Sequence, residues 1–333
     1  MMLSTAVDSF PLARPLSVAP VLNLRDRLEF IRLPRRLYAD DPHYRCLPDL
    51  LVYEQLHPRR NPWFEHGRAQ LFIARRGDEV VGRISAHIDF EHLRLHDDET
   101  GFFGFFECED DPAIARILLQ VAQDWCRTQG MKSIRGPFSF SINEECGTLV
   151  EGFDTPNYVM MAHGRPYYPE FLESHGFEGA MDLLAWRYVR EHPPEHVQQI
   201  ADAVAEHPGL VVRKLDMDNL DRDVRIIMDV FNDAWSNNWG FVPLTRSEVD
   251  KVVEDFRRIA DPEICLIAEV TENRPPWPSL CPMSTKPSPI STASSFPLVG
   301  PAFSIASRSS TRKLFGRSYL ECVENSAAMC SAA

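Results

Sequence analysis

Apolar and polar positions in the first third of the chain predict a sheet. Leu71–Arg75 and Val80–Ile88 have the composition of two strands, and Arg76-Gly77-Asp78 between them is a turn in which glycine accepts a positive φ. Gly101–Phe106 follows as a third, strongly apolar strand. The pattern therefore predicts a β-hairpin and a neighbouring strand.

The clearest helix lies directly after this third strand. Asp111 can cap it, Pro112 suits its first position and Gly130 can end it. The apolar residues between these signals recur at spacings of three and one, which predicts one buried stripe. They are Ile114, Ile117, Leu118, Val121, Ala122 and Trp125.

The remaining elements of the first half complete an α/β domain. Residues 28–53 predict short helices, broken at Arg32–Tyr38 and at Asp41-Pro42. Ser133–Phe140 predicts a strand, Pro169–Ser174 a short helix ended by Gly176, and Leu183–Val189 a last strand. The order of helices and strands predicts a mixed sheet flanked by helices over residues 16–190.

The second half begins in the same way as the first. A linker with a polar helix, residues 191–208, leads to a strand at Leu210–Leu215 and to a helix with an apolar face from Val224 to Trp235. Thr245-Arg-Ser-Glu248 is a capping-box pattern before a second helix, and Ile264–Val270 is a strand. We expect a tandem of one fold, with residues 209–273 forming only the first part of the second copy.

The composition changes at about Arg274. Residues 274–333 hold 13 Ser and 8 Pro with a net charge of +4, whereas the first 273 residues carry −17. Two explanations stay open for this tail: a genuine disordered extension, or a reading-frame shift near Glu272–Arg274. We favour the shift, because a half-built sheet with an exposed edge is an improbable product of evolution. Residues 1–15 are expected to be a flexible leader.

Charge and cysteine content exclude several classes of protein. A net charge of −13 argues against binding to nucleic acid and against docking to an anionic membrane surface. No apolar run approaches the roughly 18 residues of a membrane span, and the N-terminus does not resemble a signal peptide. Eight cysteines without a Cys-x-x-Cys pair favour reduced thiols and a cytoplasmic location. The oligomeric state stays open.

Four segments carry a resemblance to a known family. Tyr167–Phe177 resembles the late helix of the GCN5-related N-acetyltransferase (GNAT) superfamily, which commonly ends in Gly-Phe. Gly101–Asp111, Phe138–Gly147 and Asn238–Pro243 resemble bacterial tandem-GNAT proteins without assigned chemistry. The resemblance implies a GNAT-like mixed sheet in tandem, an acyl-CoA such as acetyl-CoA as the cofactor, and a small-molecule amine as the acceptor.

The family's cofactor loop does not appear in this sequence. In GNAT proteins a Gln/Arg-x-x-Gly-x-Gly/Ala loop holds the pyrophosphate on bare amides at a helix N-terminus. The equivalent segment, Glu107–Pro112, has four carboxylates and no glycine, and residues 210–333 contain no such pattern. We therefore expect that this chain does not bind acyl-CoA and is an inactive or impaired N-acyltransferase relative. The alternative is a non-catalytic module that binds a small ligand or a protein.

Candidate acceptor-site residues lie in Phe138–Gly147. The alternation of this segment places Ser139, Ser141 and Asn143 on the face opposite its aromatic residues. Glu144 or Glu145 is the candidate general base, with Asn143 and Ser141 as substrate-binding residues. Capping of a loop is the alternative role for these side chains.

The late helix supplies the other candidates. The resemblance suggests Tyr168 as the acid that returns a proton to the CoA thiolate, with His163 and Tyr167 lining the cleft, and packing is the alternative for all three. Cys146 is a weaker candidate nucleophile, since a lone cysteine is usually a packing residue. The His- and Asp-rich run from His87 to Asp98 is interpreted as a solvated loop rather than a metal site, and the Trp residues near 235–239 as helix-end packing.

Overall fold

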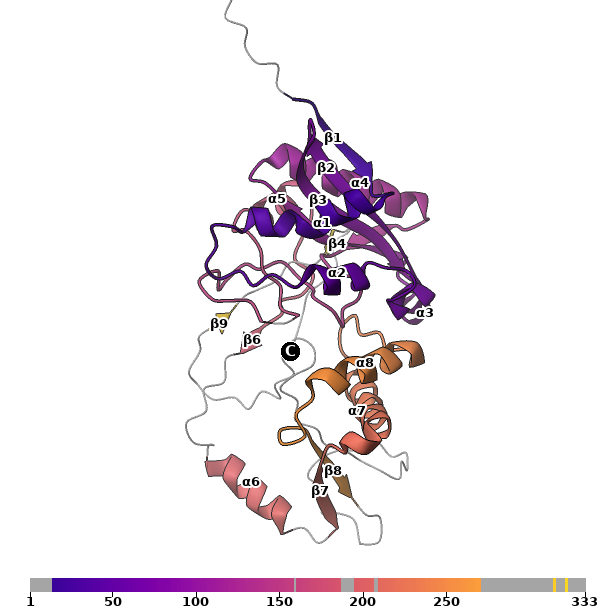
Figure 1. Cartoon of the computed structure of the whole chain (residues 1–333), viewed down its shortest axis with the longest axis vertical. Helices are drawn as coiled ribbons and strands as arrows, with labels where there is room; N and C mark the ends of the chain where they lie inside the picture. The colour runs from indigo at the N-terminus through magenta and orange to yellow at the C-terminus, as the bar shows by residue number, and fades with distance from the viewer. Residues whose placement is uncertain are drawn as a thin grey trace, which may run out of the picture.

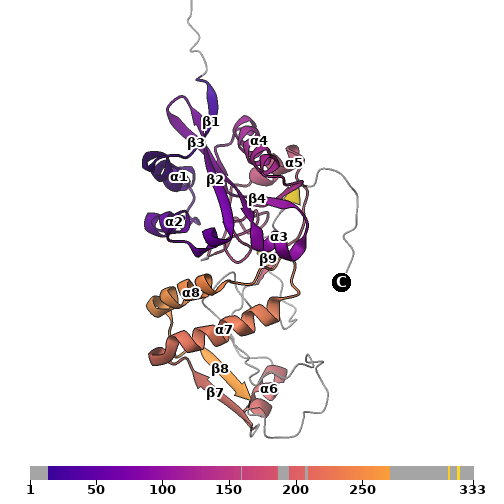
Figure 2. The same cartoon turned by 90° about the vertical axis from the view of Figure 1, so that its right-hand side faces the viewer.

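A computed structural model describes residues 14–158, 160–186, 195–206 and 209–270, together with the pairs 314–315 and 321–322. The described elements form two domains joined through α6 (Glu195–Ala205) (Figure 1). In domain one, α1 and α2 cover one face of the sheet, and α4 and α5 cover the other (Figure 2).

The elements of domain one follow the predicted order. They are β1 (Leu16–Pro20), α1 (Leu24–Leu37), α2 (Asp49–Gln55), a 3₁₀ turn η1 (Pro62–Glu65), β2 (Gly67–Arg76), β3 (Glu79–Asp89), α3 (Phe90–His96), β4 (Thr100–Cys108), α4 (Pro112–Thr128), β5 (Ser133–Arg135), α5 (Tyr168–Ser174) and β6 (Ala185–Trp186). The sheet order is β1-β2-β3-β4-β5, with the two-residue β10 (Glu321–Cys322) beside β5. Only β4 and β5 pair in parallel, and α4 connects them, which confirms the GNAT-like mixed sheet.

The strongest sequence signals are confirmed by the packing. Asp111 caps α4 by accepting a hydrogen bond from the Ala113 amide at 2.8 Å, and Gly130 has φ +91° just beyond the helix end. Ile114 and Leu118 of the predicted stripe are fully buried against the sheet. One face of α4 therefore supplies much of the core of domain one.

The expected break in the first helix does not occur. Pro34 lies inside α1, where it has no N–H to donate to the Phe30 carbonyl. Arg83 supplies the missing hydrogen bond, because its Nη1 donates to that carbonyl at 2.9 Å. A buried arginine from β3 thus allows α1 to continue through a proline.

Two other expectations about domain one are wrong. The strand predicted over Ser133–Phe140 ends at Arg135, because the chain then passes over Gly104 and returns through a bridge between Phe138 and Cys146. The run from His87 to Asp98 is not a solvated loop. His87 and Asp89 are buried at the end of β3, where Asp89 caps α3 by accepting from two of its amides.

Domain two is described as two helices over a two-stranded ladder. Its elements are β7 (Leu210–Lys214), a 3₁₀ turn η2 (Met217–Asn219), α7 (Leu220–Trp235), α8 (Arg246–Ile259) and β8 (Leu266–Val270). The predicted capping box is present, since Thr245 and Glu248 satisfy each other's backbone amides. Val224, Ile227 and Phe256 belong to the buried cluster between the helices and the ladder.

Several expectations fall wholly or partly outside the described residues. These are the flexible leader, of which only Arg14 and Pro15 are described, the last three residues of the strand at Leu183–Val189, and nearly all of the tail. Within the tail, β9 (Leu314–Phe315) pairs with β6, and β10 pairs with β5. The nature of the tail stays a prediction.

The close crossing at Gly104 predicts an unusually sensitive position. A Cβ placed there would lie 1.6 Å from the Phe138 carbonyl oxygen, so the backbone of the crossing segment would have to move. We expect Gly104→Ala to lower the free energy of unfolding by about 3 kcal/mol or more, measured by urea denaturation.

Gly130→Ala is the matched control for this crossing. Its Cβ meets nothing within 4 Å, so only the positive φ is penalised, by about 1–2 kcal/mol. Equal losses of unfolding free energy in Gly104→Ala and Gly130→Ala would contradict the close approach of the Phe138 segment to Gly104.

Candidate functional site

A buried carboxylate lies where β4 ends. Glu107 Oε2 accepts one hydrogen bond from the Tyr38 hydroxyl and one from the Tyr168 hydroxyl, each at 2.7 Å. Tyr38 directly follows α1, and Tyr168 is the first residue of α5. Three separate elements therefore converge on one charged group.

The charge of Glu107 is only partly compensated. Arg83 Nη2 stands 3.9 Å from Glu107 Oε1, a distance longer than a direct hydrogen bond. Burial raises the pKa of Glu107, while Arg83 and the two hydroxyls oppose that rise. Burial and the neighbouring carboxylate also raise the pKa values of Tyr38 and Tyr168, so both hydroxyls remain protonated donors.

Aromatic and charged side chains form a wall beside this carboxylate. The Tyr44 ring stacks on Tyr38 with centroids 4.2 Å apart, and the His163 ring meets the edge of Tyr38 at 5.4 Å. His163 Nε2 lies 2.9 Å from Asp41 Oδ2, and the Arg165 guanidinium lies over the Tyr38 ring. His163, predicted to bind substrate, is thus held by an ion-pair partner next to Glu107.

The loop after β5 brings a second carboxylate toward Glu107. Glu145 is half-buried, and burial together with the charge of Glu107 raises its pKa to about 7, although Arg83 opposes the rise. Glu144 is also half-buried and accepts a hydrogen bond from Gln55 Nε2 at 3.0 Å. Burial and the charge of Glu248 raise the pKa of Glu144 to about 7.

The other predicted residues have structural partners. Ser141 Oγ accepts from the Asn143 amide at 3.1 Å, and Asn143 Nδ2 donates to the Val242 carbonyl of domain two at 2.8 Å. The Tyr167 hydroxyl donates to the Cys108 carbonyl at 2.9 Å. Burial raises the pKa of the Cys146 thiol to about 12, which fits packing better than nucleophilic attack.

The structure thus unites some predicted residues and separates others. Tyr167, Tyr168 and His163 gather around Glu107, and Glu145 lies within its electrostatic field. Glu144 and Asn143, which precede Glu145 in the loop, instead bond to α2 and to domain two, and Ser141 accepts from the Asn143 amide. The sequence analysis did not identify Glu107, Tyr38 and Arg83 as site residues. The signal that could have pointed to Glu107 is its charge directly after the apolar strand Gly101–Phe106.

Several contacts hold domain two against domain one. His96 Nε2 lies 3.1 Å from the Phe241 carbonyl oxygen, and the Arg135 guanidinium lies over the Trp239 ring. Trp239 also packs against the cluster formed by Phe102 and Phe138. Helix-end packing was the predicted role of this tryptophan, whereas the structure packs it against domain one, so that it joins the two domains.

A histidine completes the interdomain contact. His66 Nδ1 stands 3.0 Å from Asp89 Oδ1, and its Nε2 stands 3.3 Å from Glu248 Oε1 of α8. Burial lowers the pKa of His66, but the two carboxylates outweigh it and raise that pKa to about 10. The imidazolium therefore joins a helix cap of domain one to the capping box of domain two.

The N-terminus of α4 does not fit a pyrophosphate. Asp111 already occupies the Ala113 amide, and Pro112 has no N–H. The nearby guanidiniums are engaged as well: Arg76 pairs with Asp111 at 2.6 Å, and Arg36 pairs with Glu109 at 2.9 Å. Among the described residues, the first amides of α4 are thus already bonded and both of these guanidiniums already face carboxylates, an arrangement that does not favour a bound anion.

Among the described residues, no group of three or more His, Cys, Asp or Glu side chains is placed to hold a metal ion. No helix in the described part of the chain has the length and apolar character needed to cross a membrane.

Comparison with known proteins decides the family. Over 258 residues the chain is 38% identical to the bacterial ceramide synthase of Caulobacter vibrioides (strain NA1000 / CB15N). The aligned region covers 77% of this chain and 67% of the synthase. The chain belongs to the family of this ceramide synthase. Protein YghO of Escherichia coli (strain K12), at 34% identity over 256 residues, matches 76% of the chain and 65% of its own length. The chain thus spans about two thirds of these relatives.

Solved structures give partial matches. A tandem GNAT protein from the clavulanic acid biosynthesis pathway aligns over 77% of this chain and 69% of its own, with 13% identity and a TM-score of 0.40. No protein-family model matches the chain. The mixed sheet of domain one, with its parallel β4–β5 pair connected by α4, has the strand order expected for a GNAT-like fold.

The interdomain histidine predicts a pH-dependent stability. Because its folded pKa is raised above the unfolded value of about 6.5, its contribution is complete below that value and is lost as the pH rises through about 10. We expect His66→Gln to destabilise the protein by about 2 kcal/mol at pH 6, by urea denaturation, and by much less at pH 10.

His43→Gln is the control, since the described hydrogen bonds and ion pairs give the imidazole of this half-buried histidine no carboxylate partner, and its bond to Asp41 comes from the backbone amide. A loss in His66→Gln that stays constant between pH 6 and pH 10 would contradict the assigned charge.

Proposed function

We propose that domain one carries the amine-acceptor cleft of an N-acyltransferase and that this chain lacks the usual acyl-CoA site. The observation that carries the proposal is the buried Glu107 carboxylate, which accepts from Tyr38 and Tyr168 with Arg83 3.9 Å away, together with Glu145 of the nearby loop, whose pKa burial and the charge of Glu107 raise. One guanidinium opposes two carboxylates there, so a protonated amine would restore the balance of charge.

The family supports an amine as the acceptor. One relative is named a ceramide synthase, and a ceramide is the amide of a long-chain amine. Forming such an amide requires a neutral amine, so a proton must leave the ammonium before attack on an acyl group. A carboxylate with a pKa near neutrality is suited to hold the ammonium and to accept that proton.

Glu145 is the general base in this proposal. Its raised pKa reflects burial and the charge of Glu107, and the charge of Glu107 also favours binding of a cation. Tyr168 then has a different role from the predicted acid: its hydroxyl, held between Glu107 and the Cys108 amide, fixes the orientation of Glu107. Glu144 is the alternative base, because its pKa is raised to a similar value.

The second part of the proposal concerns the cofactor. The capped and carboxylate-rich start of α4 offers no cradle for pyrophosphate in domain one. In a GNAT fold the corresponding loop of domain two follows its second hairpin strand, beyond Val270. Residues 274–333 contain no glycine loop of the required pattern, which supports an impaired enzyme or a non-catalytic ligand-binding module.

A frame shift is the proposed origin of the tail. Resequencing the codons for Val270 to Pro278 tests it. One inserted or deleted base that restores a glycine-rich loop downstream would support the shift, and an intact frame would refute it.

Amine binding should depend on pH through Glu145. With a pKa of about 7, the carboxylate fraction rises about tenfold between pH 6 and pH 8, and calorimetric affinity for butylamine should rise similarly. Glu145→Gln should remove this pH dependence and weaken binding at pH 8 by about tenfold.

Glu144→Gln is the matched variant, because Glu144 is the adjacent carboxylate with a similar pKa. It should keep the pH dependence. If Glu144→Gln flattens the profile and Glu145→Gln does not, the base is Glu144.

Acetyl-CoA should not bind this chain. Calorimetry with the full chain is expected to show no saturable heat up to millimolar acetyl-CoA, because the start of α4 has no free amides to hold a pyrophosphate. Binding in the micromolar range would contradict the assigned loss of the cofactor site.

A further inference from the structure

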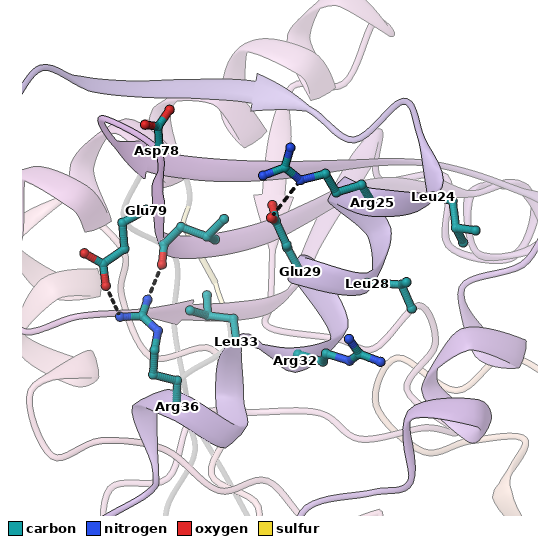
Figure 3. Close-up of a pocket in the computed structure, with 10 residues that line it drawn as sticks. Leu24, Arg25, Leu28, Glu29, Arg32, Leu33, Arg36, Asp78 and Glu79 are labelled. Atoms are coloured by element: carbon teal, nitrogen blue, oxygen red, sulfur yellow. Dashed lines mark hydrogen bonds and ion pairs between the residues drawn. The ribbon is translucent and has the colours of Figure 1, made fainter.

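Domain one shows how the first strands of this fold are completed. Its strand β2 lies between two neighbours, because it pairs in antiparallel fashion with β1 on one side and with β3 on the other. The chain returns from β2 into β3 through a turn at Gly77 and Asp78. Glu79, the first residue of β3, pairs with Arg36 of α1 at 2.8 Å (Figure 3). A strand in the position of β2 is therefore covered on both edges.

Domain two begins with elements in the same order. Apart from short 3₁₀ turns, β7, α7, α8 and β8 repeat the order of β1, α1, α2 and β2, and β8 pairs antiparallel with β7 as β2 does with β1 (Figure 2). The strand β8 thus has the position of β2. Among the described residues it pairs with β7 alone. Its other edge, called the open edge below, has no described strand beside it.

The backbone groups on the open edge belong to three residues. The Leu215 amide donates to the Cys265 carbonyl at 2.9 Å, and these two residues continue the register of the β7–β8 ladder as a hydrogen-bonded pair. In an antiparallel ladder such pairs alternate with pairs whose N–H and C=O groups point away from each other. Leu266, Ala268 and Val270 belong to the second kind, so their backbone groups point to the open edge.

The same three residues place apolar side chains on one face of the ladder. Side chains alternate between the two faces along a strand, so Leu266, Ala268 and Val270 share the face opposite Ile267, which is buried in the cluster that contains α7 and α8. Leu266 is 38% exposed, and Val212, which lies across the ladder from Ala268, is 52% exposed. The open edge therefore combines outward-pointing backbone groups with an uncovered apolar strip.

The helices of domain two leave space beside this part of the ladder. They pack around Leu215 and Ile267, whereas Val211, on the same face and opposite Glu269, is 51% exposed. Figure 1 shows the ladder extending past α7 and α8. Another strand can therefore approach the open edge without meeting these helices.

The sequence of β8 is complementary to itself in the antiparallel direction. A two-fold axis at Ala268 places this residue opposite its own copy and Leu266 opposite Val270, with about six hydrogen bonds between the strands. Glu269, which pairs with Arg213 of its own chain at 2.8 Å, then lies opposite Ile267. An axis at Glu269 would instead place two carboxylates opposite each other. Charge and side-chain type thus favour one register between two identical strands.

The continuation of the same chain is a poorer partner for this edge. Pro275, Pro276 and Pro278 follow shortly after Val270, and proline has no N–H to donate to a ladder. The two tail strands that the structure describes, β9 and β10, pair with β6 and β5 instead.

We propose that the open edge of β8 binds β8 of a second molecule of this chain, which joins the two ladders into one antiparallel sheet. The second molecule gives β8 the neighbour that β3 gives to β2. This interface goes beyond the proposed function and does not depend on it, because the residues of β8 are separate from those around Glu107.

Sedimentation velocity of the full chain tests this interface. The unmodified chain should be a dimer at micromolar concentration, and Ala268→Lys should raise the dissociation constant about tenfold, because two ammonium groups then face each other across the axis. Val212→Lys is the matched control: it adds the same charge to the same face on β7, away from the open edge, and should keep the dimer. A monomeric unmodified chain would overturn the proposal.

A charge-swap experiment separates loss of the interface from loss of the fold. Ala268→Glu should weaken the dimer as Ala268→Lys does, and an equal mixture of the two variants should associate again, because Lys then faces Glu across the axis. If the mixture stays monomeric, or if each variant alone stays as dimeric as the unmodified chain, the proposed pairing is wrong.

Hydrogen exchange identifies what covers the edge. Exchange over β8, measured by mass spectrometry of the full chain, should slow as the chain concentration rises through the dissociation constant. Strong protection that does not change with concentration would show that the edge is covered within one molecule, and it would contradict the proposal.

Discussion

The carboxylate of Glu107 is the constraint on which the rest of domain one depends. It is buried at the end of β4, and it is tolerated there because two tyrosine hydroxyls donate to it. Those tyrosines position the end of α1 and the start of α5. Loss of Glu107 would leave two buried hydroxyls without their acceptor, whereas loss of either tyrosine would leave the charge with one donor fewer.

Arg83 connects the buried Glu107 carboxylate to helix α1. The same guanidinium lies near Glu107 and supplies the hydrogen bond that Pro34 cannot make. The arginine therefore serves helix continuity and electrostatics at once. This shared role explains why a proline is accepted in α1 and why one cation must balance more than one carboxylate.

Domain two contributes by holding the loop that carries the proposed base. Val242 accepts a hydrogen bond from Asn143, two residues before Glu145, and Glu248 faces both His66 and Glu144. The orientation of the loop in domain one thus depends on contacts from domain two. In this account domain two matters for the geometry of the proposed acceptor cleft.

Much of the fold could be predicted because its signals are local. The hairpin, the caps of α4 and the capping box of α8 depend on residues within a few positions of one another, and all three are confirmed. The continuity of α1 could not be predicted, since the partner that rescues Pro34 lies 53 residues from the carbonyl it bonds.

The site depends even more on distant contacts. Glu144 and Glu145 stood out as charges at a strand end, but Glu107 is joined to tyrosines 61 and 69 residues away. No spacing in the sequence reveals such a convergence.

The most direct test is a crystal structure of the full chain with butylamine bound. The account predicts the amine nitrogen within about 3 Å of a carboxylate oxygen of Glu145 or Glu107, the ordinary length of a charge-assisted hydrogen bond. An amine nitrogen bound elsewhere, with both carboxylates contacted only by protein or water, would contradict the acceptor cleft.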